Sequence, residues 1–512
     1  MKNSIGRNIP DEILEMYHKY PYGKELDDQI KTMQKRVCNN TKIDDKLKPS
    51  LEQAIIDSGL KDGMTISFHH HFRNGDYIVN MVMDEIAKLG IKHLNLCASS
   101  LNTVHSSLIN HIKNHVIDSI ETSGLRGELA DEISRGLMSK PVLIHSHGGR
   151  ARAIETGETH INVAFIGVPN TDQYGNANGL DGDSACGSLG YALIDAKYAD
   201  YVILISDHLV TYPNSPRAID ESLVDSVVIV DKIGDSSKIA TGATRFTKDP
   251  KELLIAKTCA EVITSTPYYH DGYALQAGSG GSSLAVARFL KEKMIEDHIK
   301  ASFGLGGITG IFAELLNENL IDTLFDVQDF DLVAAKSLKD NAKHIEIDAS
   351  QYASIANKSA IVNHLDVVIL SALEIDSNFN VNVMTGFDGH LRGASGGHSD
   401  AAKGAKLTII VTPLIRGRIP TVVDEVTTVI TPGEDVDVLV TERGVAINPK
   451  RKDLVEILSK NKKLKIVDIQ ELKEKAYALT GIPEKVKTKE KVVAVIEYRD
   501  GTIIDVVNEV NE

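Results

Sequence analysis

Long apolar runs are missing from the sequence. Apolar residues make up 42% of its 512 residues, yet no run of them comes near the roughly 20 residues that a membrane-spanning helix needs. The N-terminus mixes charged and turn-forming residues and has no apolar segment of the kind found in secretory signals. These absences argue against a membrane protein and against a secreted one, so we expect a soluble, cytoplasmic protein.

Cysteine is also scarce. The chain has four cysteines, which are far apart and include no C-x-x-C pair: Cys38, Cys97, Cys186 and Cys259. Such spacing fits neither a disulfide framework nor a zinc site. We therefore expect reduced thiols and no metal site.

Basic residues are outnumbered as well. The 56 Lys and Arg residues face 71 Asp and Glu residues, which gives a formal net charge of −15. Nucleic-acid binding relies on clustered Lys and Arg that contact phosphates, so this composition argues against a nucleic-acid partner. An anionic substrate would have to be bound by groups gathered locally.

What the sequence does contain is an alternation of short apolar runs with amphipathic segments of helical period. A length of this order suggests two large domains, at about 100 to 200 residues per domain, or three smaller ones. The runs predicted to form buried strands in the first half are Met64–Phe68, His93–Ala98, Pro141–His145, Ile161–Pro169 and Tyr201–Ser206. Strands that alternate with helices predict parallel βαβ units and an α/β fold.

Breaks in this alternation indicate the domain boundaries. Residues 1–45 are polar and lack a sustained period, so we expect an N-terminal extension. The alternation stops at Tyr212–Arg217, which holds two prolines, and restarts after Asp249-Pro250. We therefore expect two α/β domains, 46–245 and 246–512, each with a mainly parallel sheet flanked by helices.

The second half repeats the pattern of strand, special turn and helix. Its predicted strands include Leu324–Val327, Val367–Leu370, Leu407–Val411 and Asp437–Val440. At the end of the chain, two alternating apolar stretches surround Asp500-Gly501, which is typical of a β-hairpin.

A glycine-rich turn, AGSGGSS, follows a predicted strand and opens a predicted helix at Ser279, Gly280 and Gly281. Backbone N–H groups in such a turn can hold a carboxylate, a phosphate or a developing oxyanion. A turn needed for tight packing is the alternative. The dinucleotide pattern G-x-G-x-x-G fails at Ser283, and no Walker motif occurs, which disfavours redox and nucleotide-hydrolysing functions.

Two further glycine-rich turns are predicted in the second half. FGLGGITG contains Gly306 and Gly307 and leads into a predicted helix, and LRGASGGH contains Gly396 and Gly397. A single glycine turn can serve packing alone. Several of them at strand ends favour a site where the backbone must approach a ligand closely.

Three consecutive histidines, His69, His70 and His71, end the first predicted strand and run into Arg73 and Asn74. Alternation along a strand puts His70 on the face opposite its two neighbours, so the three cannot readily bind one metal ion. A loop that binds an anionic substrate through imidazole and backbone donors is the favoured interpretation. A purely structural loop is the alternative.

The segment SHGGRAR also joins a predicted strand to a helix, and Arg150 could bind a substrate carboxylate. Positions two apart on a helix diverge, so at most one of Arg150 and Arg152 should face a shared site. Surface ion pairing is an equal alternative. Glu374 follows an apolar strand and is a candidate catalytic carboxylate, although a structural role is favoured.

Together these segments resemble the CoA-transferases, and most specifically the alpha chains of citrate lyase. The resemblance covers nearly the whole chain, and the segments occur in the same order. HHHFRNGD and HGGRARAIETGE are the more specific signals. The segments that carry the resemblance are KDGMTISFHHHFRNGD, SHGGRARAIETGE, LQAGSGGSSLAVARFL, ALEID, GHLRGASGGHSDAAKGAKLTIIVTP and VTERGVAINP.

The resemblance implies two CoA-transferase domains that face each other across a cleft. It also implies a reaction in which acetyl on the thioester of an acyl carrier protein is exchanged for citryl, with citrate consumed and acetate released. A separate lyase beta subunit would cleave the citryl thioester, so the chain would work in a hetero-oligomer. The dephospho-CoA-type prosthetic group would belong to the carrier, and this chain would hold no cofactor.

One departure from the family pattern bears on the mechanism. Many CoA-transferases carry a nucleophilic glutamate just ahead of the glycine turn that here spans Ala301–Gly307, and no carboxylate stands there. The resemblance therefore implies direct attack by a citrate carboxylate, through a mixed anhydride. The alternative is a transferase for another small acid with Glu374 as the nucleophile.

Residue roles follow from matching the motifs. Those expected to bind substrate are His69, His70, His71, Arg73, Asn74, Arg150, Ser279, Gly280 and Gly281. Those expected to let the thioester arm approach are Gly306, Gly307, Gly396 and Gly397.

Overall fold

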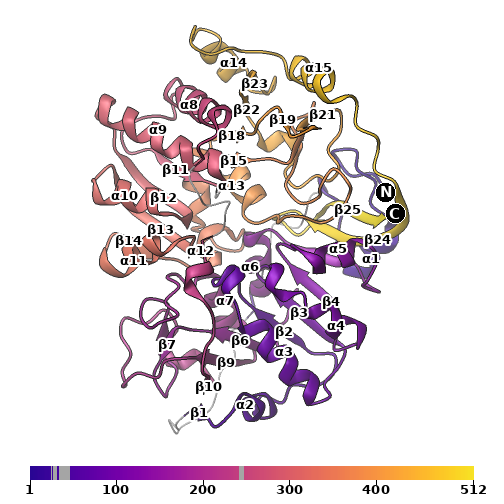
Figure 1. The fold of residues 1–512 in the computed structure, drawn as a ribbon, viewed down its shortest axis with the longest axis vertical. Helices are drawn as coiled ribbons and strands as arrows, with labels where there is room; N and C mark the ends of the chain where they lie inside the picture. The colour runs from indigo at the N-terminus through magenta and orange to yellow at the C-terminus, as the bar shows by residue number, and fades with distance from the viewer. Residues whose placement is uncertain (25, 27–30, 34–45, 241–246, 279, 512) are drawn as a thin grey trace.

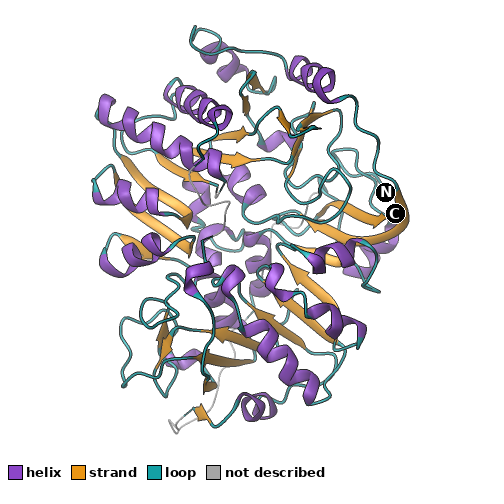
Figure 2. Cartoon of the chain, viewed as in Figure 1, coloured by secondary structure: helices purple, strands orange, loops and turns teal. Residues whose placement is uncertain are grey.

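The computed structural model describes residues 1–24, 26, 31–33, 46–240, 247–278 and 280–511. Figure 1 shows two α/β units, with the first half of the chain below the second, and both chain ends on the same side. Each unit has a sheet with helices packed against it (Figure 2). No helix formed by the described residues has the length and apolar character needed to span a bilayer.

The larger sheet has ten strands in the described part of the chain, and its neighbouring strands are parallel except for the last pair. In spatial order the strands are β1 (Leu47–Lys48), β10 (Ser226–Ile229), β9 (Tyr201–Ser206), β6 (Val163–Gly167), β2 (Thr65–Phe68), β3 (Leu94–Ala98), β4 (Ile117–Thr122), β5 (Val142–Ile144), β24 (Thr488–Glu497) and β25 (Ile503–Val510).

The helices of the first half are short, and α3 is clearly amphipathic. In α3, apolar residues recur every three or four positions, and Ile78, Val82 and Ile86 are buried. In α6, Ser146 caps the first turn by accepting from the Gly149 N–H. The helices are α1 (Asp11–Tyr17), α2 (Leu51–Asp57), α3 (Ile78–Lys88), α4 (Leu108–Lys113), α5 (Glu128–Ser134), α6 (His147–Thr156) and α7 (Gly190–Tyr198).

The second main sheet has eight strands in the described residues, parallel except for its last pair. In spatial order they are β14 (His344–Glu346), β13 (Ile321–Asp329), β12 (Ala301–Ile308), β11 (Ala274–Ala277), β15 (Val367–Ser371), β18 (Leu407–Val411), β22 (Val438–Thr441) and β23 (Gly444–Ile447). Its helices are α8 (Pro250–Thr264), α9 (Gly281–Asp297), α10 (Gly310–Asn317), α11 (Leu332–Asp340), α12 (Ala349–Ala353), α13 (His398–Gly404), α14 (Lys452–Leu458) and α15 (Ile469–Thr480).

Short strand groups lie outside the main sheets. One group of three combines β17 (Val381–Asn382), β16 (Glu374–Asp376) and β21 (Val422–Val423). Two pairs are β19 (Ile415–Arg416) with β20 (Ile419–Pro420), and β7 (Asn170–Thr171) with β8 (Ala177–Asn178). The two halves meet where α12 packs against α6 and α7.

The hairpin predicted at the end of the chain is present as β24 and β25, and it joins the sheet of the first half by pairing with β5. Residues 488–510 therefore share a sheet with the first expected domain, although they lie within 246–512 in sequence. The N-terminal segment covers this hairpin, because Ile9 and Ile13 pack against Val495 and Ile503. Residues from both ends of the chain therefore pack at the edge of the first sheet.

The predicted strands are present, whereas β4 and β12 were not predicted. The strand β4 escaped prediction because its sequence, IDSIET, has few apolar residues. The prediction of a turn at FGLGGITG is wrong, since residues Ala301–Ile308 form strand β12. There Gly304 fits tightly between neighbours, because an added Cβ would lie 2.8 Å from Phe312 and 2.9 Å from Leu324. The glycines serve a close-packed strand rather than a bend.

Candidate functional site

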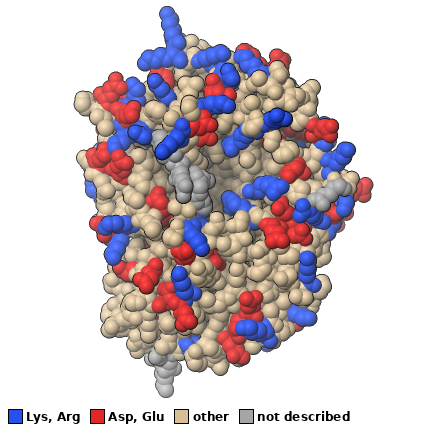
Figure 3. Space-filling view, viewed as in Figure 1, with Lys and Arg blue, Asp and Glu red and all other residues tan. Residues whose placement is uncertain are grey.

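A cavity of about 430 Å³ lies between the two halves of the chain, and residues of both line it. Among its described lining residues there is no Asp or Glu, whereas four arginines are present: Arg73, Arg126, Arg392 and Arg416. The face shown in Figure 3 is hollowed near its middle, with Lys and Arg side chains close to the hollow. In a chain of formal net charge −15, this cavity gathers positive charge.

The first-half lining comes from the ends of neighbouring parallel strands. His70 follows β2, Ser100 and Asn102 follow β3, and Arg126 follows β4. His147 opens α6 directly after β5. Carboxyl ends of parallel strands meet at one edge of a sheet, which is the usual place for ligand sites in open α/β folds.

Two histidines face the cavity as neutral rings. His70 Nδ1 lies 2.6 Å from Ser99 Oγ, and the His70 ring lies 5.7 Å from the His147 ring. Burial, followed by His147 and Arg73, lowers the pKa of His70 well below its usual value. Burial, followed by Arg150 and Arg126, lowers the pKa of His147 to about 3.

Ser99 also sets the His70 tautomer. Its Oγ accepts the His70 backbone N–H at 3.0 Å, which leaves the hydroxyl proton available for Nδ1. The ring proton then resides on Nε2. We infer that His70 offers an uncharged N–H donor.

Arg73 and Arg126 carry the charge of the cavity with no carboxylate partner among the described residues. Arg73 Nη1 is buried without a hydrogen bond, and its guanidinium lies 4.8 Å from the Phe330 ring. Burial and the charge of Arg126 lower the pKa of Arg73 to about 10. Arg126 contacts Ser100 Oγ at 3.4 Å. An anion is the ligand that would relieve this repulsion.

The backbone of Arg73, a residue that faces the cavity, is strained. Its φ of 52° lies in the left-handed region, which costs a non-glycine residue of order 1 to 3 kcal/mol. It starts a short 3-10 turn, Arg73–Gly75, at the end of the histidine segment. The fold thus maintains an unfavourable conformation at a residue that faces the cavity.

Glycines form the opposite wall. Gly280 lines the cavity and precedes α9, whose first turn has no side-chain cap, so the N–H groups of that turn are available to an anion. Gly396 and Gly397 precede α13. At Gly307, an added Cβ would lie 2.2 Å from the Phe330 ring. A side chain at Gly307 would therefore displace Phe330 into the cavity or away from Arg73.

The structure brings together part of the predicted site. The predicted residues that line the cavity are His70, Arg73, Gly280, Gly307, Gly396 and Gly397. Ser279 lies outside the described residues. The prediction that His70 faces away from its neighbours agrees with the geometry, since the His69 and His71 rings stack 6.4 Å apart.

The other predicted residues lie behind the cavity. His69 and Arg150 both contact Asp195, His69 Nε2 at 2.8 Å and Arg150 through two bonds of 2.8 and 2.7 Å. His71 Nε2 lies 2.9 Å from the Gly167 carbonyl. Asn74 Oδ1 accepts from Thr103 Oγ1 at 3.0 Å.

Two predicted glycines are also outside the described lining. Gly281 lies one residue beyond Gly280, inside α9. Gly306 packs against the Gln276 side chain, which would lie 3.1 Å from an added Cβ. Gln276 itself lines the cavity, so Gly306 acts one layer behind it.

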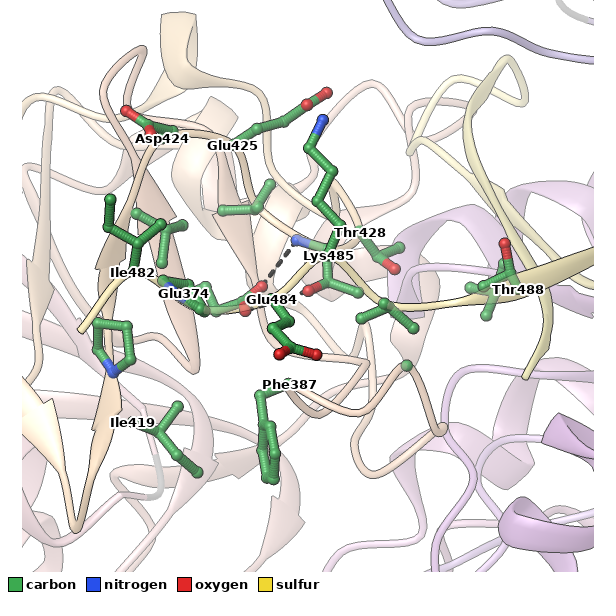
Figure 4. A pocket seen from close by; sticks show the side chains of 18 of the residues that line it. Glu374, Phe387, Ile419, Asp424, Glu425, Thr428, Ile482, Glu484, Lys485 and Thr488 are labelled. Atoms are coloured by element: carbon green, nitrogen blue, oxygen red, sulfur yellow. Dashed lines mark hydrogen bonds between the residues drawn. The ribbon is translucent and has the colours of Figure 1, made fainter. Parts of the chain in front are cut away.

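Glu374 lines a different cavity, of about 570 Å³. Its carboxylate accepts from the Thr427 N–H at 2.7 Å and from Asn382 Nδ2 at 2.8 Å, and Figure 4 shows it among Phe387, Ile419 and Lys485. Leu373, one residue earlier, lines the arginine-rich cavity. Alternation along β16 thus turns Glu374 away from that cavity.

A protein-family model matches most of the chain. Residues 44–510 fit the family model described as citrate lyase, alpha subunit (CitF). The chain belongs to the citrate lyase alpha subunit family. The resemblance seen in the sequence is therefore confirmed, together with the prediction of an enzyme of this family.

Members of the citrate lyase alpha subunit family share this sequence and structure closely. The citrate lyase alpha chain of Haemophilus influenzae is 57% identical over 463 residues, which cover 90% of this chain and 92% of that one. The crystal structure of a putative citrate lyase alpha subunit from Streptococcus mutans, in complex with citrate, is 55% identical. It superposes with a TM-score of 0.97 and covers 100% of both chains.

The fold of the family extends to distant relatives. The 4-hydroxybutyrate CoA-transferase of Porphyromonas gingivalis is 18% identical and has a TM-score of 0.51, covering 78% of this chain and 89% of that one. At this identity the likeness shows the fold alone. The prediction of CoA-transferase-like α/β domains with mainly parallel sheets and a C-terminal hairpin is confirmed.

Sequence reasoning about this member of the citrate lyase alpha subunit family missed several cavity residues. Arg126 follows β4, the strand that was not predicted. Arg392 belongs to LRGASGGH, where only the glycines were predicted to act. His147 belongs to SHGGRAR, where Arg150 was predicted instead. Arg416 and Tyr191 come from segments that carried no signal. Because β4 was not predicted, a search for basic residues after the predicted strands would also have missed Arg126.

Proposed function

We propose that this chain is the citrate CoA-transferase subunit of citrate lyase, which exchanges acetyl for citryl on the thioester of an acyl carrier protein. The observation that carries the proposal is the charge of the cavity, where Arg73 and Arg126 have no carboxylate partner and no Asp or Glu lies among the described lining residues. Citrate at neutral pH is a compact anion with several carboxylates. The cavity matches it in charge and is large enough to hold it.

Arg73 and Arg126 would bind citrate carboxylates through charge-assisted hydrogen bonds, which are stronger than neutral ones. The His70 N–H would donate without adding charge, because burial keeps the ring neutral. The N-terminus of α9 at Gly280 would complete the site from the other half. The Streptococcus mutans relative, crystallised in complex with citrate, supports this choice of ligand.

The chemical step we propose needs no covalent enzyme intermediate. A citrate carboxylate oxygen attacks the acetyl thioester carbonyl, the C–S bond breaks, and the carrier thiolate leaves behind an acetyl–citryl anhydride. The thiolate then attacks the citryl carbonyl of that anhydride, and acetate departs. Atoms and charge balance without an added reactant. A cavity with no carboxylate among its described lining residues supports this route over an enzyme thioester.

The chain's own contribution would be positioning and charge stabilisation. Backbone N–H groups at Gly280 and Gly397, which line the cavity, would stabilise a tetrahedral oxyanion. Gly307, Gly396 and Gly397 would leave room for the thioester arm. The site would also hold the citrate carboxylate against the thioester. This would speed the reaction, because the entropic cost of bringing the two reactants together is met on binding.

Partners and cofactor follow from the same proposal. The arm would be a dephospho-CoA-type prosthetic group of the carrier protein, so this chain would hold no cofactor. A separate lyase beta subunit would cleave the citryl thioester to regenerate the acetyl carrier. The working unit would be a cytoplasmic hetero-oligomer, which is consistent with membership of the citrate lyase alpha subunit family.

The proposal is tested by acetate release from an acetylated carrier protein at varied citrate concentration. Arg73→Gln and Arg126→Gln should each raise KM for citrate about 10- to 100-fold, since a charge-assisted hydrogen bond contributes roughly 1.5 to 3 kcal/mol. Arg217→Gln is the matched control, because Arg217 pairs with Asp220 on the surface. An unchanged KM in both cavity variants would contradict the proposal.

A further inference from the structure

Three buried side chains converge at the boundary between the two halves, behind the arginine-rich cavity. Asp326, Asp329 and His344 each offer a ligand atom, and these atoms lie within 4.8 Å of one another. Asp326 Oδ2, Asp329 Oδ1 and His344 Nε2 are buried and have no hydrogen-bond partner among the described residues. Buried polar atoms are seldom left unsatisfied, so this arrangement calls for an occupant.

The sheet register explains why these residues meet. Leu324 pairs with His344 and Asp326 with Glu346, so Asp326 and His344 occupy one face of adjacent strands. Asp329 would fall on the other face of a regular strand. However, Gly306 pairs with Asp326 and Gly307 with Gln328, so the pairing of β12 with β13 skips Val327. This irregularity shifts the alternation of side chains by one residue and returns Asp329 to the face that holds Asp326 and His344.

Other contacts fix the orientation of all three side chains. Asp329 Oδ2 accepts from the Ser188 N–H at 3.0 Å, and Asp326 Oδ1 accepts from the Gln328 N–H at 2.7 Å. His344 Nδ1 lies 3.1 Å from Ser337 Oγ. Each side chain therefore keeps one atom turned toward the common centre. Such supporting contacts are typical of metal ligands.

The distances fit a metal ion. His344 Nε2 and Asp326 Oδ2 are 3.3 Å apart, but they do not have hydrogen-bond geometry. Two ligands about 2.1 Å from a tetrahedral ion lie about 3.4 Å apart. Two carboxylates also cancel the charge of a divalent cation, which removes the cost of burying them as a like-charged pair.

We propose that Asp326, Asp329 and His344 form a buried structural site for a divalent cation. A mixed set of one imidazole and two carboxylates suits Zn²⁺, with Mn²⁺ as the next candidate. No motif in the sequence indicates this site, because its ligands come from two strands and have no metal-binding spacing. The site lies outside the substrate cavity and does not depend on the function proposed above.

The ion would position one wall of the cavity. Gln328 and Phe330 flank Asp329 and line the cavity, and Gln328 Nε2 donates to the His70 carbonyl at 3.0 Å. Ser188, held by Asp329, belongs to the first half. The ion would thus tie the end of β13 to the other half of the chain, as a positioning element.

A proton shared by the two carboxylates is the competing occupant. Burial raises the pKa of Asp326 to about 7, and burial together with Asp326 raises that of Asp329. The full chain would be produced with and without added Zn²⁺ or Mn²⁺, and native mass spectrometry and elemental analysis would count bound metal. We expect one ion per chain and a Tm increase of about 3 °C. A metal-free chain from supplemented medium overturns the proposal.

Two conservative variants identify the ligands. Asp329→Asn and His344→Gln should lose the ion and the Tm increase, and native mass spectrometry reads metal content on whatever fraction folds. The control His160→Gln removes an exposed histidine that lies 2.8 Å from Asp200, and it should keep both. Metal retained at full stoichiometry in both cluster variants would overturn the assignment even if the wild-type chain binds metal elsewhere.

Discussion

Two pairs of arginines follow strands of the first sheet, and their surroundings differ. Arg150 makes two bonds to Asp195, and Arg152 contacts Glu158 and Glu497. Arg73 and Arg126 have no carboxylate partner among the described residues. The first pair is compensated by the fold itself, whereas the second leaves charge for a ligand. Whether an arginine has a carboxylate partner in the fold therefore distinguishes a structural role from a ligand-binding role.

Removing a compensated arginine should have the largest effect on stability. Arg150→Ala leaves Asp195 buried with His69 alone, so we expect the free energy of unfolding to fall by about 3 to 5 kcal/mol. Urea unfolding followed by circular dichroism measures this change. Arg217→Ala at the surface is the control, with a change of roughly 0.5 kcal/mol or less. A loss no larger than the control would break the distinction between the two pairs.

Removing an uncompensated arginine should act on KM and spare the fold. In Arg73→Gln the free energy of unfolding should stay within about 1 kcal/mol of the wild-type value, or rise, because repulsion from Arg126 is relieved. The same unfolding experiment, run beside the citrate kinetics, measures both quantities. A destabilisation equal to that of Arg150→Ala would mean that Arg73 is structural.

The glycine wall offers a smaller, steric test. Gly307→Ala places a Cβ 2.2 Å from the Phe330 ring, and overpacking of this kind costs about 1 to 3 kcal/mol. We expect transfer to slow at saturating citrate, because Phe330 and the arm compete for the same space. Steady-state kinetics at varied carrier concentration checks this. Gly272→Ala, at a glycine with open space around it, controls for general effects of the substitution.

The neutral histidines predict a pH dependence of stability. His147 has a folded pKa of about 3, below the unfolded value of about 6.5. The unfolded chain therefore binds the proton first, so stability is present above about pH 6.5 and is lost as pH falls toward the folded value. At pH 5 the loss should be about 2 kcal/mol, and His147→Gln should remove it. Parallel urea titrations at pH 7 and pH 5 test the sign.

Glu374 should give the smallest effect on the reaction. Because it lines the other cavity, Glu374→Gln should keep most of the transfer rate, and stability should fall by about 1 to 3 kcal/mol through the altered hydrogen bonds to Thr427 and Asn382. Borohydride or hydroxylamine treatment during turnover, followed by peptide mass spectrometry, should leave Glu374 unmodified. A modified Glu374 would favour a covalent glutamyl thioester.

Local patterns predicted the elements well and the site in part. Apolar runs placed β2, β9 and β18 almost to the residue, and strand alternation separated His70 from His69 and His71. Pairing over long sequence distances could not be predicted, because it depends on the assembled sheet. The hairpin joins the first sheet, and Asp195 captures Arg150 from 45 positions away. Neither contact leaves a local pattern.

The glycine segments show the same limit. GSGGSS was predicted as a turn that opens a helix, and α9 begins there, while GASGGH was predicted only as a turn and is followed by α13. FGLGGITG has similar composition, but most of it forms β12, where Gly304 fits between Phe312 and Leu324. Composition alone does not reveal which side chains will surround a glycine.

A crystal structure of this chain with bound citrate tests the central claim most directly. Our account predicts citrate density in the cavity between Arg73 and Arg126 on one side and Gly280 on the other, with a carboxylate within hydrogen-bond distance of a guanidinium. Citrate found in the Glu374 cavity, or bound at Arg150 with its Asp195 pair broken, would contradict it.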